Sequence, residues 1–594
     1  RQLSLELNLT ERLFAAELGV QPLYFRPPYS IDQEPDTNDQ AAPADRIQQM
    51  GYTIIGDKID TSDWDEHPRK TPQEIVDTVL DQLRIMKTKP QFRGSIILLH
   101  DGGGDRSVTV ESLPVLIDAL RAHGYKIVPV SALMGKTRAQ VMPPIAPQQR
   151  WQARVDAVAF FIIAFFNHTV ILVFFVGDVL MTGRLVIVGL FAAIDRFRRR
   201  RLPAGAETYR PRVAVLIPAY NEEKVIARTI RSVMRSDYQN LRVIVIDDGS
   251  TDGTLEAARA ALPEELASGR LTILTKPNGG KAEALNFALE KVWEEIYVGI
   301  DADTVIAPDA ISLLIPNMAD PTVGAIAGNA KVGNRVNLWT RWQALEYITS
   351  QNFERRALDL FNVVTVVPGA IGAWRTQPVK DGGCYHVNTV AEDADLTMNL
   401  LQQGYKVIYE DRALAFTEAP DNMIGLMRQR FRWSFGILQA VFKHRMAFVK
   451  HRAMGFFALP NILIFQMLLP IFSPFIDLMF AAGVVNFVYQ HYFHPEAASN
   501  ASFEKLVAYF LAFLVVDFLA SSLAFVLEPK HPANQGDGWL LWHIWIQRFT
   551  YRQVFSLVLL KTIKRAIDGR PFNWEKQDRT ARLSASTERA TAAK

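Results

Sequence analysis

The chain has 594 residues, a formal net charge of +3 and a single cysteine, Cys384. This length is enough for several domains with cores of their own. One cysteine excludes a disulfide framework within the chain and a cysteine-based zinc site. The small net charge argues against nucleic acid as the main partner.

The first 140 residues alternate apolar runs with helical patterns. FRPPYS (25–30), DKIDTSDWDE (57–66) and GSIILLHDGGG (94–104) are separated by helical stretches such as 71–87. A further helix and a strand are expected to close the region. Taken alone, His100-Asp101 at the end of a strand is more often a turn than a catalytic site.

Apolar sequence occurs in two separate blocks. The first, 157–194, holds one long membrane span or two short ones, because a bilayer needs about 20 apolar residues as helix. The arginines between Arg196 and Arg201 place its C-terminal end in the cytoplasm. The second block, 453–565, is expected to contain three or four spans, the last of them partly interfacial. The sequence therefore predicts a multi-pass protein of the inner or plasma membrane.

Residues 210–420 alternate β-branched runs with helical patterns, which is typical of a mostly parallel sheet with crossover helices. Strands are expected at 213–220, 242–250, 271–276 and 295–304. Acidic groups fall at the ends or edges of these elements, where open α/β sheets bind ligands: Asp247 and Asp248, Asp301 and Asp303, Glu392 and Asp393.

Each acidic group alone could be a turn, a loop or a helix cap. Together they fit a sugar-nucleotide site. One carboxylate can hold Mg²⁺ or Mn²⁺ while phosphate oxygens complete the metal's shell. A second can bind the base and ribose, and a third can act as the general base for the attacking hydroxyl.

The ordered motifs of this region resemble those of processive family-2 glycosyltransferases, which include cellulose, chitin and hyaluronan synthases. They are VAVLIPAYNEE, VIVIDDGSTDGT, KPNGGKAEALN, GIDADT, AEDADL and Gln429-x-x-Arg432-Trp433. VGAIAGNAKVGNR and VVPGAIGAWR are similar to poly-N-acetylglucosamine synthases in particular. The resemblance implies a glycosyltransferase-A (Rossmann-like) α/β domain with its interfacial helix at 205–445, between membrane-spanning helices at 155–195 and 453–565.

The resemblance also implies roles for single residues. Asp393 is the catalytic base, and the substrate-binding residues are Asp247, Asp248, Lys281, Asp301, Glu392, Gly369 and Ala370. Among these, Asp248 with Asp247 binds the uridine end, Lys281 is a candidate for a uridine or phosphate contact, and Gly369 and Ala370 line the acceptor side. Asp301 and Asp303 contact the diphosphate and its Mg²⁺ or Mn²⁺.

The stretch RQRFRWSFG (428–436) contains the last of these motifs. Gln429, Arg432 and Trp433 are assigned to the transfer site. The guanidinium suits a leaving diphosphate and the indole suits stacking on the acceptor sugar. Arg428, Arg430 and Phe431 are expected on the membrane-facing side of a basic amphipathic helix, where replacement of Arg430 would have little effect.

Residues 1–140 resemble the C-terminal half of a polysaccharide deacetylase, through RPPY, DxxDW and LLHD. The resemblance implies a partial (β/α) barrel in which Arg26 orients, Asp63 is a pocket partner and His100 is the general acid. The family's Asp-Asp and His-x-x-x-His motifs, which bind its divalent metal, do not occur in residues 1–25. We expect them upstream in the full-length protein, and we expect residues 1–140 without them to be inactive as a deacetylase.

The combined prediction is a membrane-embedded, processive, inverting glycosyltransferase that polymerises and exports β-linked N-acetylglucosamine from UDP-N-acetylglucosamine. Its expected partners are this donor, the growing polysaccharide, the bilayer and accessory export or regulatory proteins. The transferase domain would be cytoplasmic and the deacetylase domain extracytoplasmic. A chitin-, hyaluronan- or cellulose-like synthase and a non-catalytic export scaffold remain as alternatives. The polar tail, 574–594, is predicted to be disordered.

Overall fold

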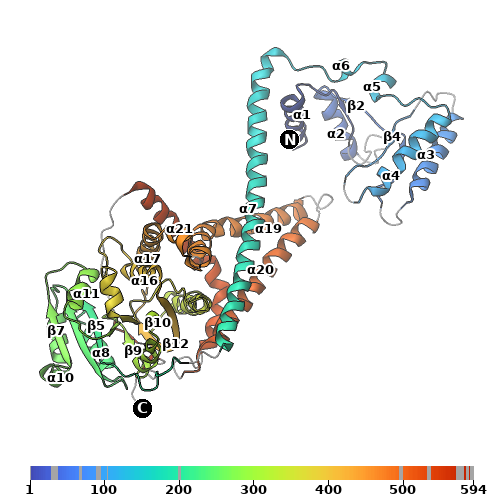
Figure 1. Ribbon diagram of the computed structural model, residues 1–594. Coiled ribbons are helices and arrows are strands. Elements are labelled where there is room, and N and C mark those ends of the chain that lie inside the picture. Colours follow the sequence, from blue (N-terminus) through green and yellow to red (C-terminus); the bar gives the residue numbers. More distant parts are fainter. Residues whose placement is uncertain are drawn as a thin grey trace. The chain divides into compact units, whose positions relative to one another are not determined.

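The computed structural model describes residues 2–27, 38–65, 70–88, 95–102, 105–198, 202–451, 453–493, 500–531, 537–569, 581–583, 587–588 and 591. The chain divides into two units, Arg1–Val173 and Phe174–Lys594. Figure 1 colours both along the sequence.

The N-terminal unit contains four very short strands among helices. Strand β1 (Tyr24–Phe25) pairs in parallel with β2 (Thr53–Ile54), and β3 (Ile59–Asp60) pairs in parallel with β4 (Ile97–Leu98). The helices are α1 (Gln2–Leu18), α2 (Asn38–Gln49), α3 (Pro72–Lys87), α4 (Ser107–Ala122), α5 (Val130–Leu133), α6 (Arg138–Val141) and the start of α7 (Arg150–Phe197).

The predicted barrel is not confirmed, because the described strands of this unit form two separate pairs. The strand expected after the helix α4 is also not among the described strands, and α5 lies at this point of the chain instead. A small core nevertheless forms: α3 begins at a capping box of Thr71 and Glu74 and buries one face against α4 and β3.

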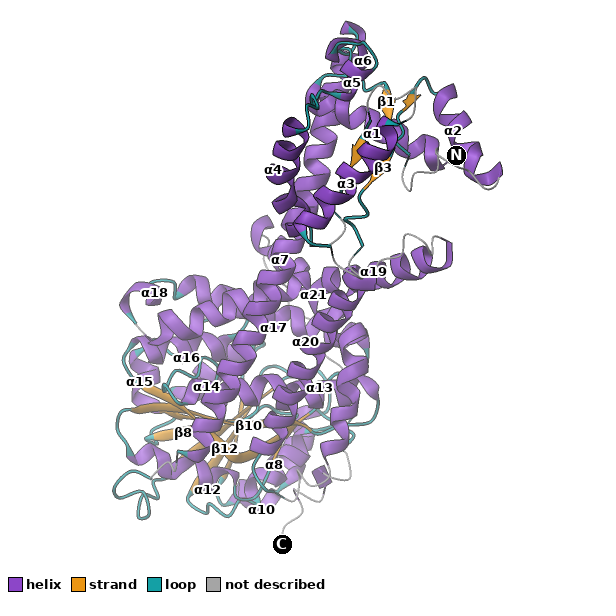
Figure 2. Cartoon of the chain, turned by 90° about the vertical axis from the view of Figure 1, so that its right-hand side faces the viewer, coloured by secondary structure: helices purple, strands orange, loops and turns teal. Residues whose placement is uncertain are grey.

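An eight-stranded mixed sheet forms the centre of the second unit (Figure 2). Its strands are β5 (Val213–Ala219), β6 (Leu241–Asp247), β7 (Leu271–Thr275), β8 (Ile296–Gly299), β9 (Val305–Ile306), β10 (Val323–Val332), β11 (Gly372–Arg375) and β12 (Lys406–Thr417), in the order β7-β6-β5-β8-β11-β10-β12-β9. The four predicted strands are confirmed as β5 to β8, and they are mutually parallel. Strand β11 is antiparallel to both of its neighbours, so the sheet is mixed.

Helices cover both faces of this sheet (Figure 2). One core contains α8 (Ile226–Met234), α9 (Thr254–Ala261) and α12 (Ala310–Leu314), and the other contains α11 (Lys281–Leu289) and α16 (Glu392–Gln402). Successive residues of β5 alternate between the two cores, as the period of a strand requires. Burial on both faces explains why this strand reads as an unbroken apolar run.

The remaining helices of the second unit lie around this sheet or form its C-terminal apolar region. They include α10 (Pro263–Ala267), α13 (Leu338–Glu346), η4 (Tyr347–Asn352), α14 (Phe353–Asp359), α15 (Thr376–Asp381), α17 (Met423–Lys443), α18 (Ala447–Lys450), α19 (Ser473–Phe493), α20 (Asn500–Leu527) and α21 (Ile544–Asp568).

Three helices in the described part of the chain are long and apolar enough to cross a membrane, namely Phe175–Phe197, Met454–Phe493 and Phe503–Leu527. The first is the end of α7, which runs without a break, so the first apolar block forms one helix and not two. The second block contains two such helices where three or four were predicted. Helix α21 is not one of them. Its Arg548 and Arg552 donate to Asp477 of α19 and Asp517 of α20, and such charges lower its hydropathy.

Most of the predicted disordered tail, 574–594, lies outside the described residues. The described part contacts the sheet domain of the second unit: Arg228 donates to the carbonyl of Ala581 at 2.9 Å, and Thr587 donates to the carbonyl of Gly333 at 3.0 Å.

Helices α16 and α17 approach each other closely at Gly436. A Cβ atom at this position would lie 2.6 Å from the backbone nitrogen of Ala391, the residue directly before α16. We predict that Gly436→Ala destabilises the fold by about 1–3 kcal/mol, because backbone cannot move aside as a flexible side chain can. Thermal unfolding in detergent measures this. Gly183→Ala, where no atom lies within 4 Å, is the matched control and should leave the midpoint unchanged.

Candidate active site

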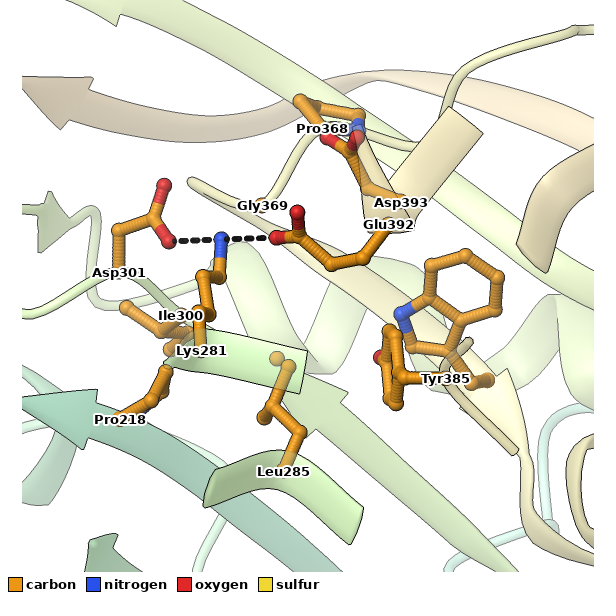
Figure 3. A pocket seen from close by; sticks show the side chains of 12 residues that line it. Pro218, Lys281, Leu285, Ile300, Asp301, Pro368, Gly369, Tyr385, Glu392 and Asp393 are labelled. Carbon is orange, nitrogen blue, oxygen red and sulfur yellow. Dashed lines mark hydrogen bonds and ion pairs between the residues drawn. The ribbon is translucent and has the colours of Figure 1, made fainter. Parts of the chain in front are cut away.

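A cavity that opens to solvent lies where β5 and β8 end at the carboxyl edge of the sheet (Figure 3). Its walls are Pro218, Lys281, Leu285, Gly299, Ile300, Asp301, Pro368, Gly369, Trp374, Tyr385, Glu392 and Asp393. Five of the predicted site residues are therefore brought together here: Lys281, Asp301, Gly369, Glu392 and Asp393. The apolar and aromatic walls were not predicted, since residues such as Tyr385 and Trp374 carry no local motif of their own.

Lys281, the first residue of α11, lies between two carboxylates of the cavity. Its Nζ atom is 2.6 Å from Asp301 Oδ1 and 3.1 Å from Glu392 Oε1 (Figure 3). Burial alone would lower the pKa of Lys281, but the charges of Asp301, Glu392 and Asp393 raise it well above its ordinary value. The cavity therefore holds a permanent cation.

Gly369 allows the backbone to approach this ion cluster. A Cβ atom here would lie 2.5 Å from Lys281 Nζ and 3.0 Å from both carboxylate oxygens of Asp301. Any other residue would displace the lysine or the carboxylate. Gly369 therefore forms part of the cavity wall. Its predicted place on the acceptor side remains a prediction.

Asp393 is the second residue of α16, and its Oδ1 accepts the N–H of Ala394 at 2.8 Å. Burial and the neighbouring Glu392 raise the pKa of Asp393 to about 6, although Lys281 and the Ala394 N–H act against this shift. A carboxylate with a pKa close to the working pH is suited to general-base catalysis. The family resemblance implied this role for Asp393, and it remains a prediction.

Asp395 anchors α16 and was missed by the sequence analysis. Its fully buried carboxylate accepts from His386 Nδ1 at 2.8 Å, Lys443 Nζ at 2.7 Å and His444 Nε2 at 2.8 Å. Burial opposes ionisation, but these three donors lower the pKa of Asp395 to about 2. The only local signal was a third acidic residue in AEDADL, and a structure was needed to show which carboxylate pairs with the end of α17.

Asp301 and Asp303, the two residues predicted to hold a metal, suit a divalent ion that is shared with a substrate. Asp301 faces the cavity, whereas Asp303 is 5% exposed and accepts the hydroxyls of Thr304 and Thr417. No three His, Cys, Asp or Glu side chains converge as a metal site among the described residues. A protein that offers one or two carboxylates leaves the rest of the shell to phosphate oxygens and water, which is how Mg²⁺ is commonly held at phosphate sites.

Asp247 and Asp248 lie at the end of β6 and do not line the cavity. The side chain of Asp248 accepts from Lys276 Nζ at 2.8 Å and from the backbone N–H groups of Gly279 and Gly280 at 3.1 and 2.7 Å. It thereby folds the loop that leads into Lys281. Its predicted contact with uridine remains a prediction.

Gln429, Arg432 and Trp433 lie on α17 and do not line the cavity. Arg432 and Trp433 precede Gly436 by four and three residues, so they share the helix face that meets Ala391 at the start of α16. Trp433 packs in one cluster with Ala370, and its ring centroid lies 6.3 Å from that of Tyr347. Arg432 makes no hydrogen bond or ion pair with any described residue, which leaves its guanidinium available.

The prediction that Arg430 and Phe431 face the membrane interface is wrong. Arg430 is 2% exposed and Phe431 is 8% exposed. Phe431 stacks on Phe435, and Lys561 of α21 lies 5.0 Å from its ring centroid. Arg430 is held by an ion pair with Glu346 at 2.6 Å. Both are buried because α17 packs against α13 and α21, and single-helix periodicity cannot show this. Arg428 alone of the three is exposed.

The predicted deacetylase residues are partly brought together in the N-terminal unit. Asp63 accepts both the backbone N–H and Nδ1 of His100 at 2.9 Å. Burial raises the pKa of Asp63, but these bonds and those from Thr109 and Thr61 lower it overall. Arg26 does not join this pair; its Nη1 lies 3.4 Å from Asp57 Oδ1.

Residues 211–436 match the family described as glycosyltransferase like family 2, so this region is a family-2 glycosyltransferase domain. The chain is 26% identical over 269 residues to the poly-beta-1,6-N-acetyl-D-glucosamine synthase of Staphylococcus aureus, across 45% of this chain and 64% of that protein. It is 26% identical over 287 residues to the synthase of the same name from Staphylococcus epidermidis, across 47% and 68%. The chain thus spans about two thirds of the length of these curated relatives.

The mannosyltransferase PcManGT from Pyrobaculum calidifontis, solved in complex with GDP-Man and Mn²⁺, is similar at 22% identity with a TM-score of 0.40. The similarity covers 58% of this chain and 98% of that one.

The fall in the rate of sugar transfer at low pH should follow the protonation of Asp393. A base must be deprotonated, so we predict that kcat falls as pH drops through about 6. Lys281→Met removes a charge that lowers the pKa of Asp393, so it should move this midpoint upward. Lys276→Met, the control, removes a loop lysine that pairs with Asp248 and should leave the midpoint in place. A midpoint that ignores Lys281 would contradict this electrostatic account.

Proposed function

We propose that the chain is a processive, inverting polysaccharide synthase that polymerises N-acetylglucosamine from UDP-N-acetylglucosamine. The observation that carries the proposal is the cavity at the carboxyl edge of the sheet. It holds a half-buried candidate base, Asp393, together with a cation, Lys281, and the carboxylate of Asp301 that pairs with this cation. The names of the relatives favour this sugar over glucose.

The proposed reaction is a single displacement. Asp393 accepts the proton of a hydroxyl on the growing chain, whose oxygen attacks the anomeric carbon of an α-linked donor. The bond from that carbon to the diphosphate oxygen breaks, UDP leaves with the electron pair, and the new linkage is β. Asp393 then gives its proton to solvent before the next cycle.

Charge neutralisation is the second requirement of this reaction. Lys281 lies in the cavity but is already paired with Asp301 and Glu392, whereas Arg432 has no carboxylate partner among the described residues. Arg432 is therefore the cation available for the departing diphosphate, with Lys281 close to the same site. A divalent ion at Asp301 would neutralise the same phosphates when bound. The side chain of Trp433 would stack on the acceptor sugar.

The apolar helices support a membrane location with export of the polymer. The arginines after Phe197 favour a cytoplasmic transferase domain. The pairing of His100 with Asp63 supports the proposal that the N-terminal unit is related to polysaccharide deacetylases.

Asp393→Asn tests the proposal directly. We predict a loss of UDP release from UDP-N-acetylglucosamine by a factor of about 100 to 10,000, because the general base is removed. Membranes that contain the protein would be supplied with UDP-N-acetylglucosamine or UDP-glucose, and UDP and polymer would be measured. The exposed carboxylate of Asp381 provides the control, and Asp381→Asn should retain activity.

Each other outcome has a defined meaning. Turnover of UDP-glucose alone would support a cellulose-like synthase and overturn the proposed donor. Full UDP release by Asp393→Asn would remove Asp393 from the base role. Export of polymer without turnover of either donor would favour a non-catalytic scaffold.

A further inference from the structure

The guanidinium of Arg430 stacks on the ring of Trp433 and donates hydrogen bonds to Gln429 and Glu346. The sequence had instead placed Arg430 at the membrane interface. We propose that Arg430 is a positioning residue that fixes the orientation of Trp433 and Gln429 for the acceptor sugar. The inference rests on the proposed function, since it assumes that these two residues serve the acceptor end of the transfer site.

The plane of the guanidinium determines where the indole lies. The Cζ atom of Arg430 is 4.3 Å from the ring centroid of Trp433, a cation–π stack. The same atom is 5.9 Å from the ring of Tyr347, which itself lies beside Trp433. The indole is therefore supported by a charged plane on one face, and its rotation would require Arg430 to move.

The edge of the guanidinium orients Gln429. Nη1 of Arg430 donates to Oε1 of Gln429 at 2.8 Å. This bond uses the carbonyl end of the carboxamide, so the Nε2 donor is turned away from Arg430. Nε2 makes no hydrogen bond with the described residues, and it is the end that can donate to a sugar hydroxyl.

Arg430 is in turn held from two other helices. Its Nη2 donates to Glu346 of α13 at 2.6 Å and to the hydroxyl of Tyr551 of α21 at 3.2 Å, and Tyr551 also donates to Glu346. The three side chains form a closed network across α13, α17 and α21. The network holds the guanidinium of Arg430 in place, and this restrains the side chains of Trp433 and Gln429, which both contact it.

Only arginine can make these contacts together. Its planar fork donates in two directions and stacks at the same time, whereas a lysine ammonium is a point charge without a face. Arg430→Lys keeps the charge that balances Glu346, so it separates positioning from neutralisation. It is also less prone to unfold the protein than Arg430→Ala, which would leave Glu346 buried without its partner.

The experiment measures how tightly UDP release is coupled to sugar incorporation, and not only the overall activity. Wild type, Arg430→Lys and Glu346→Gln would be prepared as the full chain in detergent or membranes. UDP release and incorporation of sugar into polymer would be measured with UDP-N-acetylglucosamine, and UDP affinity by calorimetry. We expect Arg430→Lys to lower polymer elongation by about 10-fold to 100-fold, because small displacements of positioning groups have effects of this size. UDP affinity should change less than about twofold, because the guanidinium lies outside the donor cavity.

The ratio of UDP released to sugar incorporated is the decisive readout. Misplacement of Trp433 should raise it, since donor would be hydrolysed without extension. A merely structural role would lower both quantities together and leave the ratio unchanged, which would overturn the inference. Arg356→Lys is the matched control, because Arg356 is equally buried in an ion pair, with Asp411, and lies on α14 rather than on α17.

A double-mutant cycle tests whether Arg430 acts through Trp433. If it does, the loss of polymer extension in Trp433→Ala with Arg430→Lys should be smaller than the two single losses combined, and the part that remains beyond Trp433→Ala reports the release of Gln429. Additive losses would overturn the inference. Failure of the wild type to use UDP-N-acetylglucosamine would instead overturn the proposed function, so the two failures are distinguishable.

Discussion

Three carboxylates meet at the carboxyl edge of the sheet, and their mutual repulsion is the constraint on which the site depends. Asp301, Glu392 and Asp393 can share one cavity only if a cation lies among them or one of them takes up a proton. Lys281 supplies that cation, and Gly369 leaves the space in which it lies. A diphosphate with its own metal would alter this balance, so the cluster is suited to respond to the arrival and departure of a charged donor.

Helix α17 joins this cluster to the rest of the second unit. Its Gly436 lets α16 approach, and its C-terminal Lys443 and the following His444 hold Asp395. Further toward its start, Arg430 connects it to α13 and α21. One helix thus carries both the motif proposed to face the substrate and the contacts that hold the proposed base in place.

Much of the transferase domain could be predicted from the sequence. The strands β5 to β8 were identified because they are buried on both faces and read as apolar runs. Asp301, Glu392 and Asp393 were singled out because acidic groups at the ends or edges of α/β elements have a known chemistry, and Lys281 was singled out by the family resemblance of its loop. Strand β11 and the aromatic walls of the cavity were not identified, because long-range pairing determines them. The assignment of Arg430 failed for the same reason, since the helices that bury it are distant in sequence.

In the N-terminal unit the sequence identified local motifs but did not predict the fold. Its motifs singled out Asp63 and His100, which are hydrogen-bonded to each other, but the order of its elements did not yield the expected barrel. A short motif specifies the immediate neighbours of a side chain, whereas closure of a barrel depends on register across many strands.

The core on the α16 face of the sheet has one more consequence. It does not end at the transferase domain, because Met454, Ala458, Leu459 and Ile462 of the first C-terminal apolar helix are buried in the same cluster as Ala394 and Leu396 of α16. The apolar contacts therefore continue from the sheet into that helix. Cutting the chain between the sheet domain and this helix would therefore expose the apolar surface that the two share.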